Sequence, residues 1–149
     1  MIAVDTNILV YAHRSDSDFF GAASAAIRKL AESSEQWAVP WPCIHEFLAV
    51  VTNPRIFKAP TPIGAAIQQV DTWLESPGLT LIGESRHYWR NLTEALTEGK
   101  IAGGKVHDAR ISAICRSHGV RELWTADRDF SRIPGVKTRN PLLAGKTRR

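Results

Sequence analysis

The stretch Met1-Ile-Ala-Val-Asp-Thr-Asn-Ile-Leu-Val-Tyr-Ala12 opens with a short apolar run, residues 2–4, that stops at Asp5. Such a run, bounded by a polar break, is typical of a strand buried on both faces of a parallel sheet. Residues 8–12 are apolar again and predict a helix, with Asp5, Thr6 or Asn7 near its cap. Ligands bind at the carboxyl ends of strands in open parallel sheets, so Asp5 is a candidate functional residue. A plain helix cap is the alternative.

The rest of the chain alternates between short apolar runs and amphipathic segments. The runs predict strands at residues 37–41, 79–82, 122–125 and 136–138. The amphipathic segments predict helices at residues 19–33, 42–52, 63–74, 87–96 and 106–117. Glycines in residues 98–105 predict a flexible loop. We therefore expect a single α/β domain over residues 1–145, with a mostly parallel central sheet flanked by helices, and a basic tail at 146–149.

The composition is that of an ordinary globular protein, with 149 residues, 44% hydrophobic and 23% charged. No apolar run approaches the roughly 20 residues needed to cross a bilayer, and no secretory signal is evident. The two cysteines, Cys43 and Cys115, lie in apolar helical contexts that suggest neither a disulfide framework nor a zinc site. We expect a cytoplasmic protein. Its net charge of +4 is compatible with a polyanionic partner.

Acidic residues fall at places where a structural role alone would favour apolar or neutral side chains. Glu46 and Asp108 are spaced three, four or seven residues from apolar positions, so each is expected on an inward helical stripe. Asp127 follows a predicted strand by two residues, and Asp129 comes shortly after. Taken singly, each acid also has a structural explanation. Asp108 could be a charge favoured by the helix dipole, and Glu46 could pair with an arginine. Asp127 and Asp129 could be ordinary turn residues.

Taken together, these acids are expected to meet Asp5 at one end of the sheet. Like charges at close range imply a divalent cation or shifted pKa values. An all-oxygen ligand set favours Mg²⁺ or Mn²⁺ over zinc. Such a cluster suits hydrolysis of a phosphodiester, because a divalent ion can activate water and neutralise developing charge.

Four motifs in order, Val4-Asp-Thr-Asn7, Ile44-His-Glu-Phe47, Val106-His-Asp-Ala109 and Thr125-Ala-Asp-Arg-Asp-Phe130, resemble the PIN-domain family. More narrowly, they look like the VapC toxins of type II toxin–antitoxin systems, and Thr52-Asn-Pro-Arg-Ile-Phe57 extends the likeness. The resemblance implies a Mg²⁺-dependent endoribonuclease. Because no pair of histidines suits a general base for the RNA 2′-hydroxyl, metal-activated water is the expected nucleophile. The resemblance carries the roles of catalytic residue and metal ligand onto Asp5, Glu46, Asp108 and Asp127. Asn7 and Thr125 would be polar supports, and Asp129 is an additional acid of open role.

The same resemblance implies a homodimer and a VapB-like antitoxin whose C-terminal segment covers the active site. The apolar segments at residues 8–12 and 19–30, with Trp37 and Trp41 nearby, predict an exposed groove for an amphipathic helix. The histidines, including His45 and His107, show no repeated ligand spacing and are expected in surface or packing roles. Two alternatives remain open: a receiver-like phosphoacceptor domain, and a metal-binding PIN-like interaction module without turnover.

Overall fold

A five-stranded parallel sheet forms the centre of the molecule, in the order β3-β2-β1-β4-β5. The computed structural model describes residues 1–143, so the predicted tail at 146–149 lies outside the described residues. The strands are β1 (Ile2–Val4), β2 (Trp37–Pro40), β3 (Leu79–Ile82), β4 (Glu122–Trp124) and β5 (Lys137–Arg139). The predicted α/β class is confirmed, and every strand pairing within the described residues is parallel.

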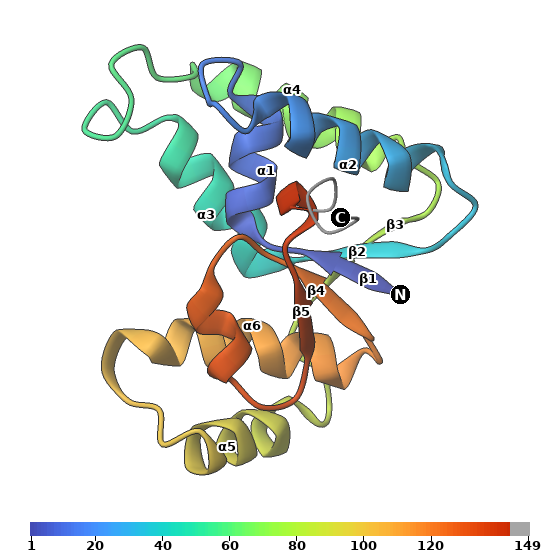
Figure 1. The fold of residues 1–149 in the computed structure, drawn as a ribbon, viewed down its shortest axis with the longest axis vertical. Helices are drawn as coiled ribbons and strands as arrows, with labels where there is room; N and C mark the ends of the chain where they lie inside the picture. The colour runs from blue at the N-terminus through green and yellow to red at the C-terminus, as the bar shows by residue number, and fades with distance from the viewer. Residues whose placement is uncertain (144–149) are drawn as a thin grey trace.

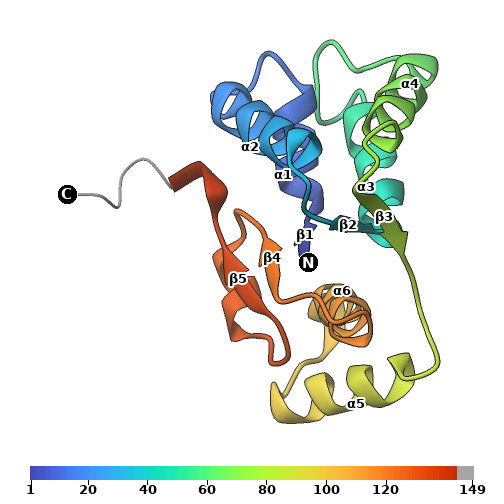
Figure 2. The same ribbon diagram turned by 90° about the vertical axis from the view of Figure 1, so that its right-hand side faces the viewer.

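Helices cover both faces of this sheet, as Figures 1 and 2 show. One face carries α1 to α4 and the other carries α5 and α6. The helices are α1 (Thr6–His13), α2 (Phe20–Glu32), α3 (Trp41–Val51), α4 (Ile63–Leu74), α5 (Tyr88–Glu98) and α6 (Val106–Ser117). None of the described helices is long and apolar enough to span a membrane.

The order of the strands creates a switch point beside β1. The chain runs outward from β1 to β2 and β3 through α1 to α4, and then crosses to the other side of β1 through α5 and α6. Strand β4 therefore pairs with β1 on the edge opposite to β2. Ligands of open α/β sheets bind at the carboxyl ends of the strands, where the connections diverge in this way.

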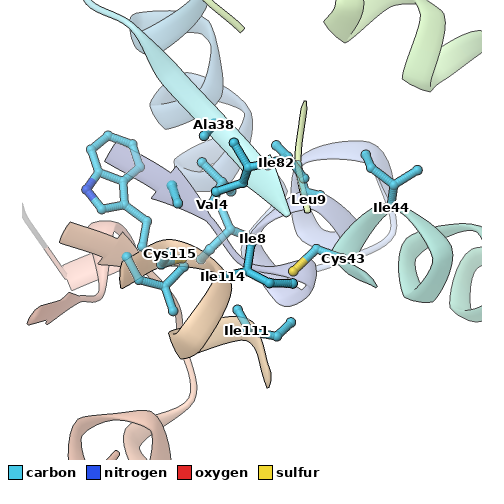
Figure 3. Packing of buried hydrophobic residues seen from close by; sticks show 14 of the residues in the cluster. Val4, Ile8, Leu9, Ala38, Cys43, Ile44, Ile82, Ile111, Ile114 and Cys115 are labelled. Atoms are coloured by element: carbon cyan, nitrogen blue, oxygen red, sulfur yellow. The ribbon is translucent and has the colours of Figure 1, made fainter. Parts of the chain in front are cut away.

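The core anchors the end of β1 and the start of α1. Val4, Ile8 and Leu9 are fully buried, and Figure 3 shows them among side chains of β3, α3 and α6, including Ile82 and Ile114. Burying each aliphatic side chain of this size contributes about 1.5–3 kcal/mol. The backbone that carries the first polar residue after β1 is therefore held rigidly.

The expected boundaries of helices and strands lie within two residues of the observed ones, and two of the differences are informative. Trp41 begins α3 and does not end β2, because Pro42 directly after it suits the first turn of a helix. The expected loop at residues 98–105 contains the last residue of α5 and a 3₁₀ turn, η1 (Gly103–Lys105). Gly103 adopts a φ of 65°, a backbone conformation that glycine accepts without steric cost.

Candidate active site

A cleft of about 660 Å³ lies at the carboxyl end of the sheet, beside the switch point. Its lining includes carboxylates from four different parts of the chain. Asp5 follows β1 and Asp127 follows β4, while Glu46 lies on α3 and Asp108 lies in the first turn of α6. The structure thus brings the four candidate acids around one cleft, although 122 residues separate the first from the last in sequence.

Asp5 is the buried member of this group, with 5% of its surface exposed. It caps α1 by accepting a hydrogen bond from the Thr6 backbone N–H onto Oδ1 at 2.8 Å. Oδ2 accepts from the Thr125 hydroxyl at 2.8 Å and from Asn7 Nδ2 at 3.5 Å. The Cys43 thiol lies 3.6 Å from Oδ1. Asp5 is therefore a helix cap and a member of the acidic cleft at once, so the two interpretations of this residue are compatible.

The electrostatics of Asp5 follow from these neutral partners. Burial raises the pKa of Asp5 from 3.8 to about 6, and the hydrogen bonds from Thr125, Thr6 and Cys43 only partly oppose that rise. Every donor to the carboxylate is uncharged. A buried carboxylate without a positive partner is costly, so the position is suited to a bound cation.

Glu46 lies differently from the expectation. Its side chain is exposed to the cleft and does not point into the core. The Thr6 hydroxyl donates to Glu46 Oε2 at 3.3 Å, which links α3 to the start of α1. Cys43, three residues earlier on the same helical stripe, is buried, whereas the stripe borders the cleft at Glu46, where solvent reaches it.

Asn7 and Thr125 join the ends of β1 and β4. Asn7 donates to the Thr125 hydroxyl at 3.3 Å and accepts from the Ala126 backbone N–H at 3.1 Å. The Thr125 hydroxyl oxygen also accepts from the Asp127 N–H at 3.0 Å while the hydroxyl donates to Asp5. One network therefore fixes the relative positions of Asp5 and Asp127.

Asp108, Asp127 and Asp129 form the outer part of the site together with a lysine. Lys105 Nζ lies 2.7 Å from Asp129 Oδ2 and 3.9 Å from Asp108 Oδ2. Burial, followed by the charge of Asp127, raises the pKa of Asp108, whereas Lys105 acts in the opposite direction. The hydrogen bond from Lys105 lowers the pKa of Asp129. Asp129 thus differs from the other acids because it accepts a hydrogen bond from a lysine, whereas Asp108 reaches the same lysine only at 3.9 Å.

The donor set fits a hard divalent cation, because it consists of carboxylate oxygens with a buried, raised-pKa aspartate among them. The acids surround the cleft loosely, however. No group of three His, Cys, Asp or Glu side chains within residues 1–143 is arranged so that it could hold a metal ion. Binding one ion with three of these carboxylates therefore requires side-chain movement, which the exposed Glu46 and the half-buried Asp108 can provide.

Several residues of the cleft escaped the sequence interpretation. Thr6 and Cys43 contact the acids, but the sequence indicates Thr6 only as a possible cap residue and Cys43 only as an apolar helix position. His45 and His107, expected in surface or packing roles, are exposed and line the cleft beside Glu46 and Asp108.

The structure agrees only in part with the exposed groove expected from the apolar segments. Most of those side chains are in the core, including Ile8, Leu9, Ile27 and Trp37. A separate hollow of about 970 Å³ lies beside α2, between its alanines and the C-terminal part of the described chain, and is lined among others by Ala22, Ala25, Ala26, Trp124 and Leu142.

The fold and the cleft define a doubly wound α/β domain with carboxylates at its switch point, an arrangement suited to metal-assisted hydrolysis. The model of the PIN domain family matches residues 2–136, and the chain belongs to this family. Ribonuclease VapC43 of Mycobacterium tuberculosis is 31% identical over 142 residues, which cover 95% of this chain and 96% of that protein.

Solved structures share the same fold. VapBC2 from Rickettsia felis, bound to a DNA fragment from its promoter, has a chain that superposes with a TM-score of 0.69 at 23% identity, covering 94% of this chain and 98% of that one. VapC20 of Mycobacterium tuberculosis, described as a toxin that cleaves the sarcin–ricin loop, gives a TM-score of 0.67 at 19% identity, covering 94% and 100%.

Proposed function

We propose that this protein is a metal-dependent endoribonuclease and the toxin of a VapBC-type toxin–antitoxin system. The observation that carries the proposal is the single cleft that four carboxylates line at the switch point of the sheet. Relatives named as ribonucleases support it, among them one that is 31% identical over nearly the whole chain. Membership of the PIN family argues against the receiver-like alternative.

Asp5, Glu46, Asp108 and Asp127 would hold the ion, with Mg²⁺ as the first choice and Mn²⁺ as the alternative. When bound, such an ion supplies an activated water and stabilises the charge that develops on the phosphate. Asn7 and Thr125 orient Asp5 and Asp127 through the hydrogen bonds described above. Asp129 would not bind the ion directly but would position Lys105, whose Nζ donates to Asp129 Oδ2 at 2.7 Å.

Hydrolysis by water leaves a 5′-phosphate and a 3′-hydroxyl. The competing route uses the 2′-hydroxyl of the RNA as nucleophile, needs a general base such as histidine, and leaves a cyclic phosphate. His45 and His107 line the cleft, so the end groups of the products are the informative measurement. Hydrolysis by water is favoured because the cleft is lined by acids and the buried Asp5 has no cationic partner among the described residues, which suits a bound metal ion.

We further propose that the protein forms a homodimer and binds a VapB-like antitoxin in the cytoplasm. The support for the partner is the likeness to the chain of a VapBC assembly, and the free, buried Cys43 and Cys115 suit a reducing compartment. Light scattering and co-expression with the antitoxin test the assembly. A monomer that captures no antitoxin would contradict it.

The activity is tested by incubating structured RNA with the protein in Mg²⁺ and in EDTA, and by determining the ends of the products. The expected result is cleavage in Mg²⁺ alone, with 5′-phosphate ends, that is lost in Asp5→Asn. Cleavage that persists in EDTA or ends in a 2′,3′-cyclic phosphate overturns the mechanism. Metal binding without cleavage of any RNA would favour an interaction module without turnover.

A further inference from the structure

The cleft is lined by two chemically different sets of side chains. Along α1 and α3 the acids Asp5 and Glu46 come first, and lining side chains that are apolar or aromatic follow them in the chain. These later residues, here called the apolar end, are Val10, Tyr11, Val50, Ile56 and Phe57. Ile56 is 54% exposed, although a large apolar side chain gains most from burial. The apolar end and the carboxylates line the same cavity. A substrate long enough to extend beyond the carboxylates would therefore contact the apolar end.

The loop that carries Ile56 and Phe57 is held in place. The Asn53 carbonyl accepts hydrogen bonds from the Ile56 and Phe57 N–H groups at 3.1 Å and 3.0 Å. The Arg14 guanidinium lies over the Phe57 ring, 4.1 Å from its centroid, and donates to the Ala59 carbonyl at 2.8 Å. Arg14 therefore covers one face of the Phe57 ring, and the two backbone hydrogen bonds fix the position of Ile56 in the loop.

Tyr11 lines the same cleft from α1. It lies one helical turn after Asn7, about 6 Å further along the axis of α1, on the face that lines the cleft. Its ring packs on Phe19 with the centroids 5.0 Å apart, and it remains half-buried. An aromatic ring thus stands next to the acidic end at the distance of a single helical turn.

The surroundings favour a nucleic acid over an apolar peptide. Arg55 and Lys58 flank the pair Ile56 and Phe57 in sequence and are both exposed, so the loop carries two cations next to two residues that line the cleft. Cations that track a phosphate backbone, combined with aromatic side chains that contact bases, are the usual elements of single-strand binding.

We propose that the apolar end of the cleft, formed by Tyr11, Ile56 and Phe57, binds a nucleobase that neighbours the scissile phosphate in single-stranded or looped RNA. The proposal rests on the ribonuclease function proposed above. Contact with a flat base is tolerant of sequence, because every base has a π-face. The subsite would therefore position the RNA backbone over the acids without selecting one base strongly.

Two variants remove the subsite and one serves as a matched control. Ile56→Ala and Tyr11→Leu each remove contact area from the cleft. Ile63→Ala truncates an equally exposed isoleucine, 58% against 54%, on α4 outside the cleft. Binding is measured in EDTA by fluorescence anisotropy, with oligoadenylate and with an oligonucleotide of the same ribose phosphate backbone that lacks bases. Cleavage of ribosomal RNA is measured in parallel with Mg²⁺.

The expected result is that removing the bases weakens binding to the wild type roughly tenfold. Ile56→Ala and Tyr11→Leu should abolish most of that difference, and Ile63→Ala should retain it. Equal binding with and without bases overturns the subsite, even when ribosomal RNA is cleaved. Variants that bind RNA normally but lose a co-expressed antitoxin overturn it too. Base-dependent binding without any cleavage would refute the proposed nuclease and leave the subsite standing.

Discussion

The buried charge of Asp5 should make the metal-free protein less stable as the pH rises. Burial raises the pKa of Asp5 from 3.8 to about 6. Between about pH 4 and pH 6 the folded state therefore keeps a proton that the unfolded state has released. The stabilisation is fully present below about pH 4 and is lost as the pH rises through about 6.

The magnitude follows from that pKa. At about 1.4 kcal/mol for each pKa unit, a rise from 3.8 to about 6 corresponds to about 3 kcal/mol of unfolding free energy. For a domain of this size, a loss of that order lowers the melting temperature by roughly 10 °C. Because Asp5 is 5% exposed, solvent screening reduces this value little.

The assay compares urea unfolding of the wild type and Asp5→Asn in EDTA between about pH 4 and pH 7. Taking the difference removes the contributions of other groups, including Asp108, whose pKa is raised, and Asp16, Glu84 and Asp129, whose pKa values are lowered. Asparagine keeps the bond from Thr6 but places an amide against the Thr125 hydroxyl, which already accepts from Asp127. That mismatch adds an offset of about 1–3 kcal/mol that does not depend on pH.

The expected outcome is a wild-type stability that falls by about 3 kcal/mol relative to Asp5→Asn across this range. Mg²⁺ at pH 7 should restore the wild type, because a ligand that binds the native state stabilises it, and should restore the variant less. A difference that stays constant from about pH 4 to pH 7 would refute the reasoning about the buried charge.

Four further outcomes follow from the same contacts. The Thr125 hydroxyl donates to Asp5 at 2.8 Å and thereby lowers the pKa of Asp5. Thr125→Val removes this hydrogen bond, so the midpoint of the stability titration should rise above about 6. An unchanged midpoint would contradict the role of the hydroxyl in setting the pKa of Asp5. Asp108→Asn and Asp127→Asn should each lower kcat at least about 100-fold on structured RNA, whereas Asp18→Asn, an exposed acid outside the cleft, should leave the rate unchanged. Lys105→Met should tighten Mg²⁺ binding several-fold in calorimetry, because it removes a cation 2.7 Å from Asp129 and 3.9 Å from Asp108; weaker binding would contradict competition between the two cations. Burial raises the pKa of Cys115 to about 12 and that of Cys43 well above its usual range, so neither thiol should react with a disulfide reagent at pH 8 until urea unfolds the protein.

Local patterns in the sequence were sufficient for the elements and for the candidate acids. The apolar run before Asp5 indicates a buried strand, and a polar residue directly after such a strand marks its carboxyl end. The same reasoning applies to β4 and Asp127, and helical spacing indicated α3 and α6 as the carriers of Glu46 and Asp108. These features depend on residues a few positions apart, and short-range periodicity reports them reliably.

Only the tertiary structure decided which of these pieces meet. Strand β4 pairs with β1, and this pairing places the Thr125 hydroxyl 2.8 Å from an Asp5 that is 120 residues away in sequence. The exposure of Glu46, the ion pair between Lys105 and Asp129, and the apolar end of the cleft at Ile56 likewise depend on how separate elements pack. Hydrophobic periodicity states which face of an element is apolar, but many partners could cover that face equally well. The order of strands in the sheet selects the partner, and with it the residues that share the site.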